Sequence, residues 1–326
     1  MEAAPGLATA RRWRTVPVFA FRAVAIAAAC LLVGLASAGH TAIADGGAQF
    51  FSGNLTLALP GNGDPSFITI DLLMADDGSD DFDVHATAVG EQLLAQFPGA
   101  VPITSGEVSA QYLLKRYKWL DSHPSWGYNP AGKPATLSDD AEAIKAAAAS
   151  WGAIGANVGF VDAGITAATP GACQNVADGL NTIGWRTLPA GVLATTCTYW
   201  SASAGATESD IQIDPSWSWT TNLSVIRMDL QSVVTHELGH ALGMDHPCDF
   251  SRPTTCDPSA RTTVMYGTYL AGTNRRTPQP DDIAGILAVY GPTESPAPSR
   301  LAPPAQQSAL QAVLPYRRAI AAIARE

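Results

Sequence analysis

Basic residues, histidines and cysteines are all scarce in this 326-residue chain. Lysine and arginine number 19 against 29 aspartates and glutamates, which gives a formal net charge of −10. An acidic surface disfavours nucleic acids and anionic membranes as partners. Because the chain has only 6 histidines and 5 cysteines, any site with imidazole or thiolate ligands must draw on a small, identifiable set. Hydrophobic residues make up 47% of the chain, which is enough for a full globular core.

The N-terminus has the layout of an export signal. Four arginines precede an uncharged run at residues 23–38. The run ends in Ala36-Ser37-Ala38, and Ala42-Ile43-Ala44 is a second candidate cleavage site. It is shorter than the roughly 20 residues of a transmembrane helix. We expect residues 1–44 to be a signal peptide, cleaved after residue 38 or 44, and the mature protein to be secreted, extracellular and monomeric; an uncleaved membrane anchor is the alternative.

The histidines are concentrated, because three of the six lie between residues 236 and 246. Residues four apart share one face of a helix, so His236 and His240 can aim their nitrogens at one ion, with Glu237 beside them. Gly243 permits the left-handed conformation that ends a helix and lets the chain double back. His246 can then complete a three-nitrogen site that leaves a fourth position open for water. The pattern predicts a hydrolase with one catalytic zinc.

This extended motif is that of the metzincin metalloproteases, and other segments resemble one family of that clan, the matrixins. The segment around Met265 resembles the methionine-containing turn beneath the metal, so Met265 is the expected hydrophobic base. Residues 281–291 resemble the closing helix of matrixins, and residues 142–160 resemble their first helix and following strand. Residues 209–214 resemble the strand before the active-site helix. The segments occur in the matrixin order over about residues 112–292.

The resemblance implies an α+β metzincin-type catalytic domain at residues 110–292, with a mixed twisted sheet, a long first helix, an active-site helix and a C-terminal helix. It also implies a secreted zinc endopeptidase in which Glu237 is the general base that activates a zinc-bound water. The partner is then a protein or peptide substrate that lies extended along an edge strand near residues 191–199. The expected pocket residues are Leu193, Ala194 and Tyr269.

Other features depart from the matrixin pattern. Pro247 follows the third histidine, where matrixins usually have serine. No histidine lies between His123 and His236, so a second, structural zinc has no ligand set. Matrixin propeptides keep the enzyme latent through a cysteine on the zinc. No cysteine lies between Cys30 and Cys173, which excludes that mechanism here.

Residues 45–109 carry no recognisable site, and their position suggests a propeptide-like or accessory segment. Alternating apolar residues predict strands at residues 50–59 and 67–73, and residues 89–97 fit a short helix. An aspartate or His85 could block the zinc in place of a cysteine, or the segment could serve folding alone. The sequence does not choose between these alternatives.

Local patterns predict further elements of the catalytic region. Residues 116–120 are expected to form its first strand, and Asp229 to cap the active-site helix. Ile144 and Trp151 belong to a stripe that turns one face of the first helix inward. Residues 293–326 begin as a Pro/Ala-rich linker and end in a short predicted helix.

Four cysteines remain beyond the predicted signal peptide, and an exported chain is expected to pair them. Three connectivities are formally possible. We expect the local pairs, Cys173–Cys197 and Cys248–Cys256. The second pair would fix the loop that follows His246 and so lower the entropy cost of assembling the site.

The identity of the bound ion has an alternative to zinc. Calcium is a second candidate ion, although scattered acidic residues are more typical of a solvated surface. Its candidate ligands are Asp162, Asp178, Glu208, Asp210 and Asp214.

The alternative function is a zinc-binding extracellular surface or binding protein without turnover. Such a protein would keep the histidines and lose the acid, so the intact Glu237 counts against it.

Overall fold

The computed structural model describes residues 53–61, 63–76, 92–103, 113–121, 123–247 and 257–293. The predicted signal peptide, His85, the Cys248–Cys256 pair and the tail beyond residue 293 lie outside these residues, so those predictions stay untested. All described residues belong to one compact unit. Within them, no helix is long and apolar enough to cross a bilayer.

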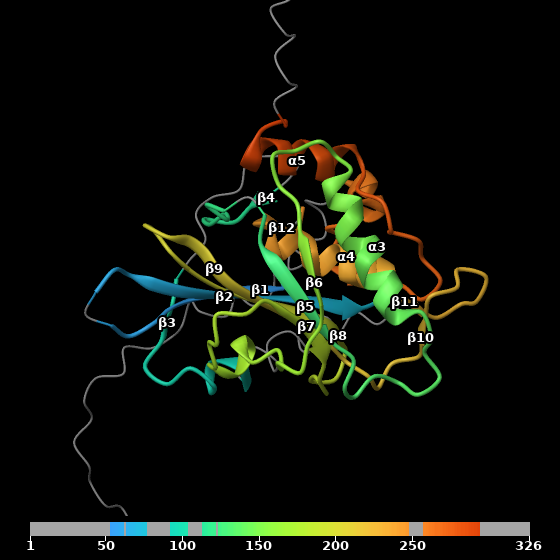
Figure 1. The fold of residues 1–326 in the computed structure, drawn as a ribbon, viewed down its shortest axis with the longest axis horizontal. Coiled ribbons are helices and arrows are strands. Elements are labelled where there is room, and N and C mark those ends of the chain that lie inside the picture. The colour runs from blue at the N-terminus through green and yellow to red at the C-terminus, as the bar shows by residue number, and fades with distance from the viewer. Residues whose placement is uncertain are drawn as a thin grey trace, which may run out of the picture. The chain divides into compact units, whose positions relative to one another are not determined.

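A mixed, nine-stranded sheet crosses the described part of the chain (Figure 1). Its strands are β1 (Asn54–Ala58), β2 (Ser66–Ala75), β3 (Val101–Pro102), β5 (Ser125–Asn129), β6 (Val161–Ile165), β7 (Thr182–Trp185), β8 (Val192–Ser201), β9 (Gly205–Ile213) and β13 (Thr268–Tyr269). The spatial order is β3-β1-β2-β8-β9-β7-β5-β6, and β13 also pairs with β2. β5, β6, β7 and β9 are parallel, whereas β8 is antiparallel to both of its neighbours.

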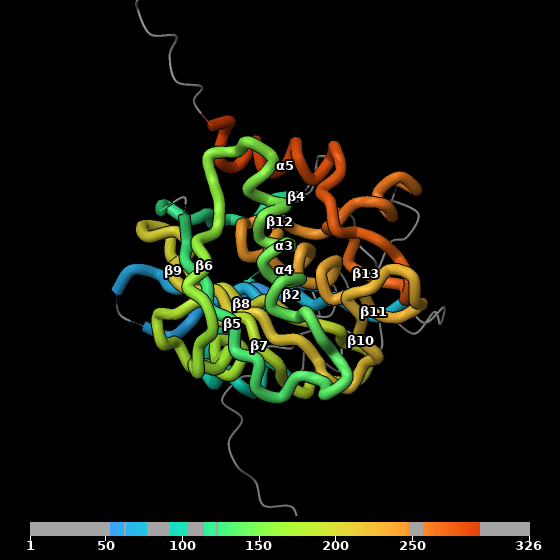
Figure 2. The backbone as a smooth tube through the Cα atoms, turned by 45° about the vertical axis from the view of Figure 1, so that its right-hand side comes forward, coloured from blue at the N-terminus to red at the C-terminus, as the bar shows by residue number. Residues whose placement is uncertain are grey.

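Helices α3 (Asp140–Gly152) and α4 (Leu230–Ala241) lie side by side on one face of this sheet, and they remain adjacent in the turned view of Figure 2. α5 (Pro280–Tyr290) follows near the end of the described chain. Ile144 and Trp151 of α3 are fully buried, as the predicted stripe requires. The α+β fold with a mixed sheet is therefore confirmed.

Residues 116–120 form no strand, so the expectation of a first strand there is wrong, and β5 is the first strand of the catalytic region that joins the central sheet. That segment makes only one bridge to the sheet, through Trp119. Its aromatic side chains instead satisfy carbonyl groups at the end of α4. The Tyr117 hydroxyl donates to the carbonyl of His240 at 3.0 Å, and the Trp119 indole donates to that of Ala241 at 2.8 Å. A short pair of strands, β4 (Leu113–Leu114) and β12 (Met244–Asp245), lies beside it.

Two apolar clusters lie on the two faces of the sheet. The larger one lies between the sheet and helices α3 and α4, and it includes Leu73 of β2. The second cluster combines Leu57, Ile68 and Leu72 with residues of β8 such as Val192. β2 contributes to both clusters because successive side chains of a strand point to opposite faces.

The described strands before residue 110, which are β1, β2 and β3, thus belong to the central sheet. Both predicted strands are present, as β1 and β2, whereas only residues 92–94 of the expected helix are helical among its described residues. β2 is buried from Ile68 to Met74. Neither finding tests the propeptide role.

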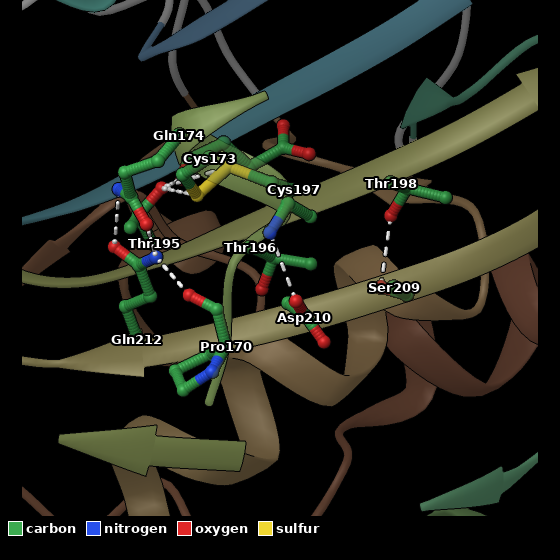
Figure 3. Close-up of a disulfide and its surroundings, with 12 residues drawn as sticks. Pro170, Cys173, Gln174, Thr195, Thr196, Cys197, Thr198, Ser209, Asp210 and Gln212 are labelled. Carbon is green, nitrogen blue, oxygen red and sulfur yellow. Dashed lines mark hydrogen bonds between the residues drawn. A yellow bond between two sulfur atoms is a disulfide. The ribbon is translucent and has the colours of Figure 1, made fainter. Parts of the chain in front are cut away.

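One disulfide bond ties the loop before β7 to β8 (Figure 3). Cys173, in the 3-10 helix η1 (Ala172–Gln174), is bonded to Cys197, with Cα atoms 5.4 Å apart. This is the predicted local pair. Beside it, the Gln212 side chain donates to the carbonyl of Pro170 at 2.5 Å, so the same loop is also held to β9.

Removing this disulfide bond should destabilise the protein measurably. The bond joins residues that are 24 apart in sequence, and closing a loop of this length contributes about 3 kcal/mol in the chain-entropy model. Replacing both Cys173 and Cys197 by alanine should therefore lower the free energy of unfolding by about 3 kcal/mol, as measured by equilibrium urea denaturation. An unchanged urea midpoint would show that packing alone fixes the loop.

Candidate metal centre

The three predicted histidines converge on a single point. Their Nε2 atoms are 2.9 Å (His236 to His240), 3.1 Å (His240 to His246) and 3.3 Å (His236 to His246) apart. A four-coordinate zinc with bonds of roughly 2.0 to 2.1 Å places its ligand nitrogens about 3.4 Å apart. Within the described residues, this is the only group of three or more potential ligands that lie this close together. The donor set therefore fits one zinc ion.

Backbone carbonyls orient two of the rings. Nδ1 of His236 donates to the carbonyl of Val264 at 2.7 Å, and Nδ1 of His240 donates to that of Met244 at 3.0 Å. These bonds leave each Nε2 lone pair free to face the metal. Burial lowers the pKa of His236 and His240 well below the ordinary value, and the neighbouring imidazoles lower it further. Both rings are thus neutral, which is the form that binds metal.

The end of α4 and the turn that follows it bring in the third ligand. Asp229 caps the start of the helix, as predicted, by accepting from the backbone N–H of Ser232 at 2.9 Å. Gly243 has φ 92°, and a Cβ there would lie 2.7 Å from the carbonyl oxygen of Tyr117. Only glycine fits this turn without strain. The turn then delivers His246, whose backbone N–H donates to the Asp245 carboxylate at 2.8 Å.

Glu237 follows His236 on α4 and is fully buried. Its Oε2 accepts from the Thr196 hydroxyl on β8 at 2.5 Å, whereas Oε1 has no hydrogen-bond partner among the described residues. Burial raises the pKa of Glu237 well above the ordinary value, and Thr196 opposes this shift. Sequence reasoning missed Thr196, because nothing in a strand sequence marks which hydroxyl will face a distant helix.

A buried ion network adjoins the centre and was also missed. Nζ of Lys115 lies 2.5 Å from the Asp71 carboxylate and 2.8 Å from that of Asp245. The same Asp71 oxygen is 3.7 Å from Nδ1 of His240. Burial raises the pKa of Asp71 to about 7, although Lys115 opposes the shift. The network links β2 to the turn that carries the third histidine.

The methionine turn packs beneath the metal-site helix. A Cβ on Gly239 would lie 2.3 Å from the sulfur of Met265, so the sulfur rests directly against the helix between the first two ligands. The turn is fixed from below by Asp282 of α5, whose carboxylate accepts from the N–H groups of Val264 at 2.9 Å and Met265 at 3.2 Å. α5 therefore supports the carbonyl that orients His236.

Comparisons with known proteins agree with this geometry. Residues 189–291 match the family model described as Matrixin, and the match includes all three histidines and Met265. This part of the chain is matrixin-like. Relatives include interstitial collagenase of Oryctolagus cuniculus (33% identical over 88 residues), metalloendoproteinase 1-MMP of Arabidopsis thaliana (32% over 87 residues) and matrix metalloproteinase-16 of Homo sapiens (36% over 96 residues).

These similarities are confined to part of each protein. They cover 27%, 25% and 29% of this chain, respectively. They cover 16%, 21% and 14% of the three relatives. The comparison therefore identifies the matrixin-like region, and it leaves the strands before residue 189 to be interpreted from the structure.

The predicted pocket residues of the matrixin-like region are covered. Leu193, Ala194 and Tyr269 are each at most 1% exposed. The expectation of an edge strand at residues 191–199 is wrong, because β8 is paired with β9 on one side and with β2 on the other. The covering strand comes from more than a hundred residues earlier in the chain, a pairing that no local pattern indicates.

The candidate calcium ligands already have backbone partners. Asp210 accepts from the N–H groups of Ala172 at 2.9 Å and Thr182 at 2.8 Å. Glu208 accepts from the N–H of Gly179 at 2.6 Å. These carboxylates fix the loops around β7, and calcium binding stays a prediction without a defined site.

Zinc binding should depend on the converging histidines. Replacing His246 by alanine should weaken zinc binding by about a hundredfold or more, since even a partner outside the ligand set costs about 10- to 100-fold. His123→Ala is the matched control, because His123 is outside the ligand group. Competition with a chromogenic zinc chelator measures both affinities. Equal affinities for the two variants would show that zinc binds elsewhere.

Proposed function

We propose that this chain is an exported zinc endopeptidase that hydrolyses peptide bonds in proteins. The observation that carries the proposal is the convergence of three imidazole nitrogens in a matrixin-like region, with two of these histidines and a buried glutamate on the same helix. Relatives named collagenase and metalloendoproteinase support a protein substrate. The proposal includes residues 1–44 as the signal peptide and residues 110–292 as the catalytic region.

The roles of the residues follow from their chemistry. His236, His240 and His246 would hold zinc, which when bound supplies a Lewis acid and lowers the pKa of water. Glu237 takes the proton of the attacking water on its free Oε1 and passes it to the leaving amine. The Thr196 hydroxyl, 2.5 Å from Oε2, keeps that carboxylate in one orientation. The raised pKa of Glu237 suits a group that must both accept and release a proton.

The tight packing around Glu237 makes it a precise proton carrier. A carboxylate with one oxygen anchored and the other unpaired has a single place at which to receive a proton. The sulfur of Met265 packs against the same helix, and β8 supplies the Thr196 hydroxyl. Such fixed geometry lowers the barrier because little rearrangement accompanies proton transfer.

Replacing Glu237 by glutamine should abolish most turnover while zinc stays bound. The amide keeps the size of the side chain but cannot accept the proton, which costs about 10²- to 10⁴-fold in kcat. Glu208→Gln is the matched control, because Glu208 is also a buried glutamate but lies away from the zinc ligands. Casein cleavage and zinc content per chain are the two measurements.

Chelation gives an independent check of the same proposal. Removing zinc should abolish casein cleavage, and adding zinc back should restore it. If mature protein with about one zinc per chain shows no chelator-sensitive cleavage in any activated form, the endopeptidase proposal fails. A zinc-binding protein without turnover would then be the better description.

A further inference from the structure

The metal centre is closed by the chain itself. His236, His240, His246 and Glu237 are each at most 1% exposed. An endopeptidase must admit an extended peptide to these groups. Some part of the covering structure must therefore leave before a substrate can bind.

The covering structure is strand β2. It pairs antiparallel with β8, from Ser66 opposite Ser201 to Met74 opposite Val192. At its far end it pairs in parallel with β13, where Ala75 lies opposite Tyr269. The sequence predicts that an extended substrate lies along β8, and it predicts Tyr269 of β13 as a pocket residue. β2 makes with β8 the backbone pairing that such a peptide would make.

β2 passes the metal centre at residues 71–74. The N–H of Leu72 donates to the carbonyl of Gly53 at 2.8 Å, and a Cβ on Gly53 would lie only 3.0 Å from the ring of His246. The N–H of Met74 donates to the carbonyl of Gly267, two residues after the methionine of the turn, at 3.2 Å. The two backbone hydrogen bonds, donated by Leu72 and by Met74, lie on either side of the Leu72–Leu73 peptide bond.

Leu73 of β2 packs in the same apolar cluster as the predicted pocket residues. It is fully buried and lies opposite Ala194 in the register, and the cluster also includes Leu193 and Tyr269. Those three residues are the ones that the sequence predicts for a substrate side chain. Leu73 therefore takes the position that a substrate residue needs.

We propose that β2 is a built-in occupant of the peptide groove, and that the protein stays closed until this strand is displaced or removed. The inference rests on the proposed endopeptidase function and specifies how that same site is regulated. No cysteine is needed, because backbone pairing and Leu73 block the groove. The buried Lys115 bridges Asp71 of β2 and Asp245 beside the third ligand, and Asn54 of β1 donates to Asp245 at 3.0 Å. These contacts anchor the strand.

The rival interpretation is that β2 is a permanent strand of the catalytic sheet. The two interpretations predict opposite effects of weakening it. A permanent strand supports the active site, so weaker packing of β2 would lower activity. An occupant competes with substrate, so its loss of packing raises activity, because turnover scales with the fraction of molecules whose groove is open.

The decisive variant is Leu73→Ala, and its matched control is Ile183→Ala in β7. Both remove a buried aliphatic side chain from the same sheet and cluster, but Ile183 is remote from the groove. With zinc-loaded full-length protein, we expect Leu73→Ala to raise kcat/KM for a peptide by about tenfold or more. Ile183→Ala should lower thermal stability without raising kcat/KM.

Hydrogen exchange of the full chain tests the inference without turnover. In Leu73→Ala, the amides of residues 66–75 should exchange about tenfold or more faster than in the parent protein, through local opening, while α4 and β9 stay protected. If β2 exchanges only together with α4 in both proteins, or if Leu73→Ala loses activity in step with Ile183→Ala, the proposal is overturned. If β2 opens selectively but no zinc-loaded variant cleaves a peptide, the proposal that β2 occupies the groove stands and the proposed endopeptidase function is refuted.

Discussion

Three imidazole nitrogens lie within 3.3 Å of one another in a buried site, and the surrounding elements hold this arrangement. Burial keeps His236 and His240 neutral. Carbonyls of the methionine turn and of Met244 fix their rings. The Asp282 carboxylate of α5 fixes the methionine turn by accepting hydrogen bonds from its backbone N–H groups. The histidine motif on α4 therefore depends on the methionine turn, on Met244 and on α5.

The burial that keeps the imidazoles neutral also controls access to them. An unpaired β8 would present a row of unpaired backbone groups, which invites unwanted pairing with other chains. β2 satisfies that edge and shields the pocket at the same time. We infer that edge protection and latency are met by one strand. The cost is that the strand must move before the proposed chemistry can start.

Sequence reasoning succeeded where the determining contacts are local. The spacing of His236 and His240, the cap at Asp229 and the inward stripe of α3 depend on the geometry of a single helix. The Cys173–Cys197 pair closes a short loop, and it too is present. Reasoning failed at residues 116–120, because Tyr117 and Trp119 donate to carbonyls at the end of a helix more than a hundred residues away.

The sequence by itself determined which three histidines come together, which acid follows the first of them, and the fold class, because these follow from residue spacing and from segments that resemble one family. Only the tertiary structure decided that β8 is covered, that Thr196 holds Glu237, and that Lys115 joins Asp71 to Asp245. The physical reason is that strand partners and buried ion pairs are selected by long-range packing. The alternation of apolar and polar residues along a strand indicates which face is buried, but it does not indicate which other strand will pair along its edge.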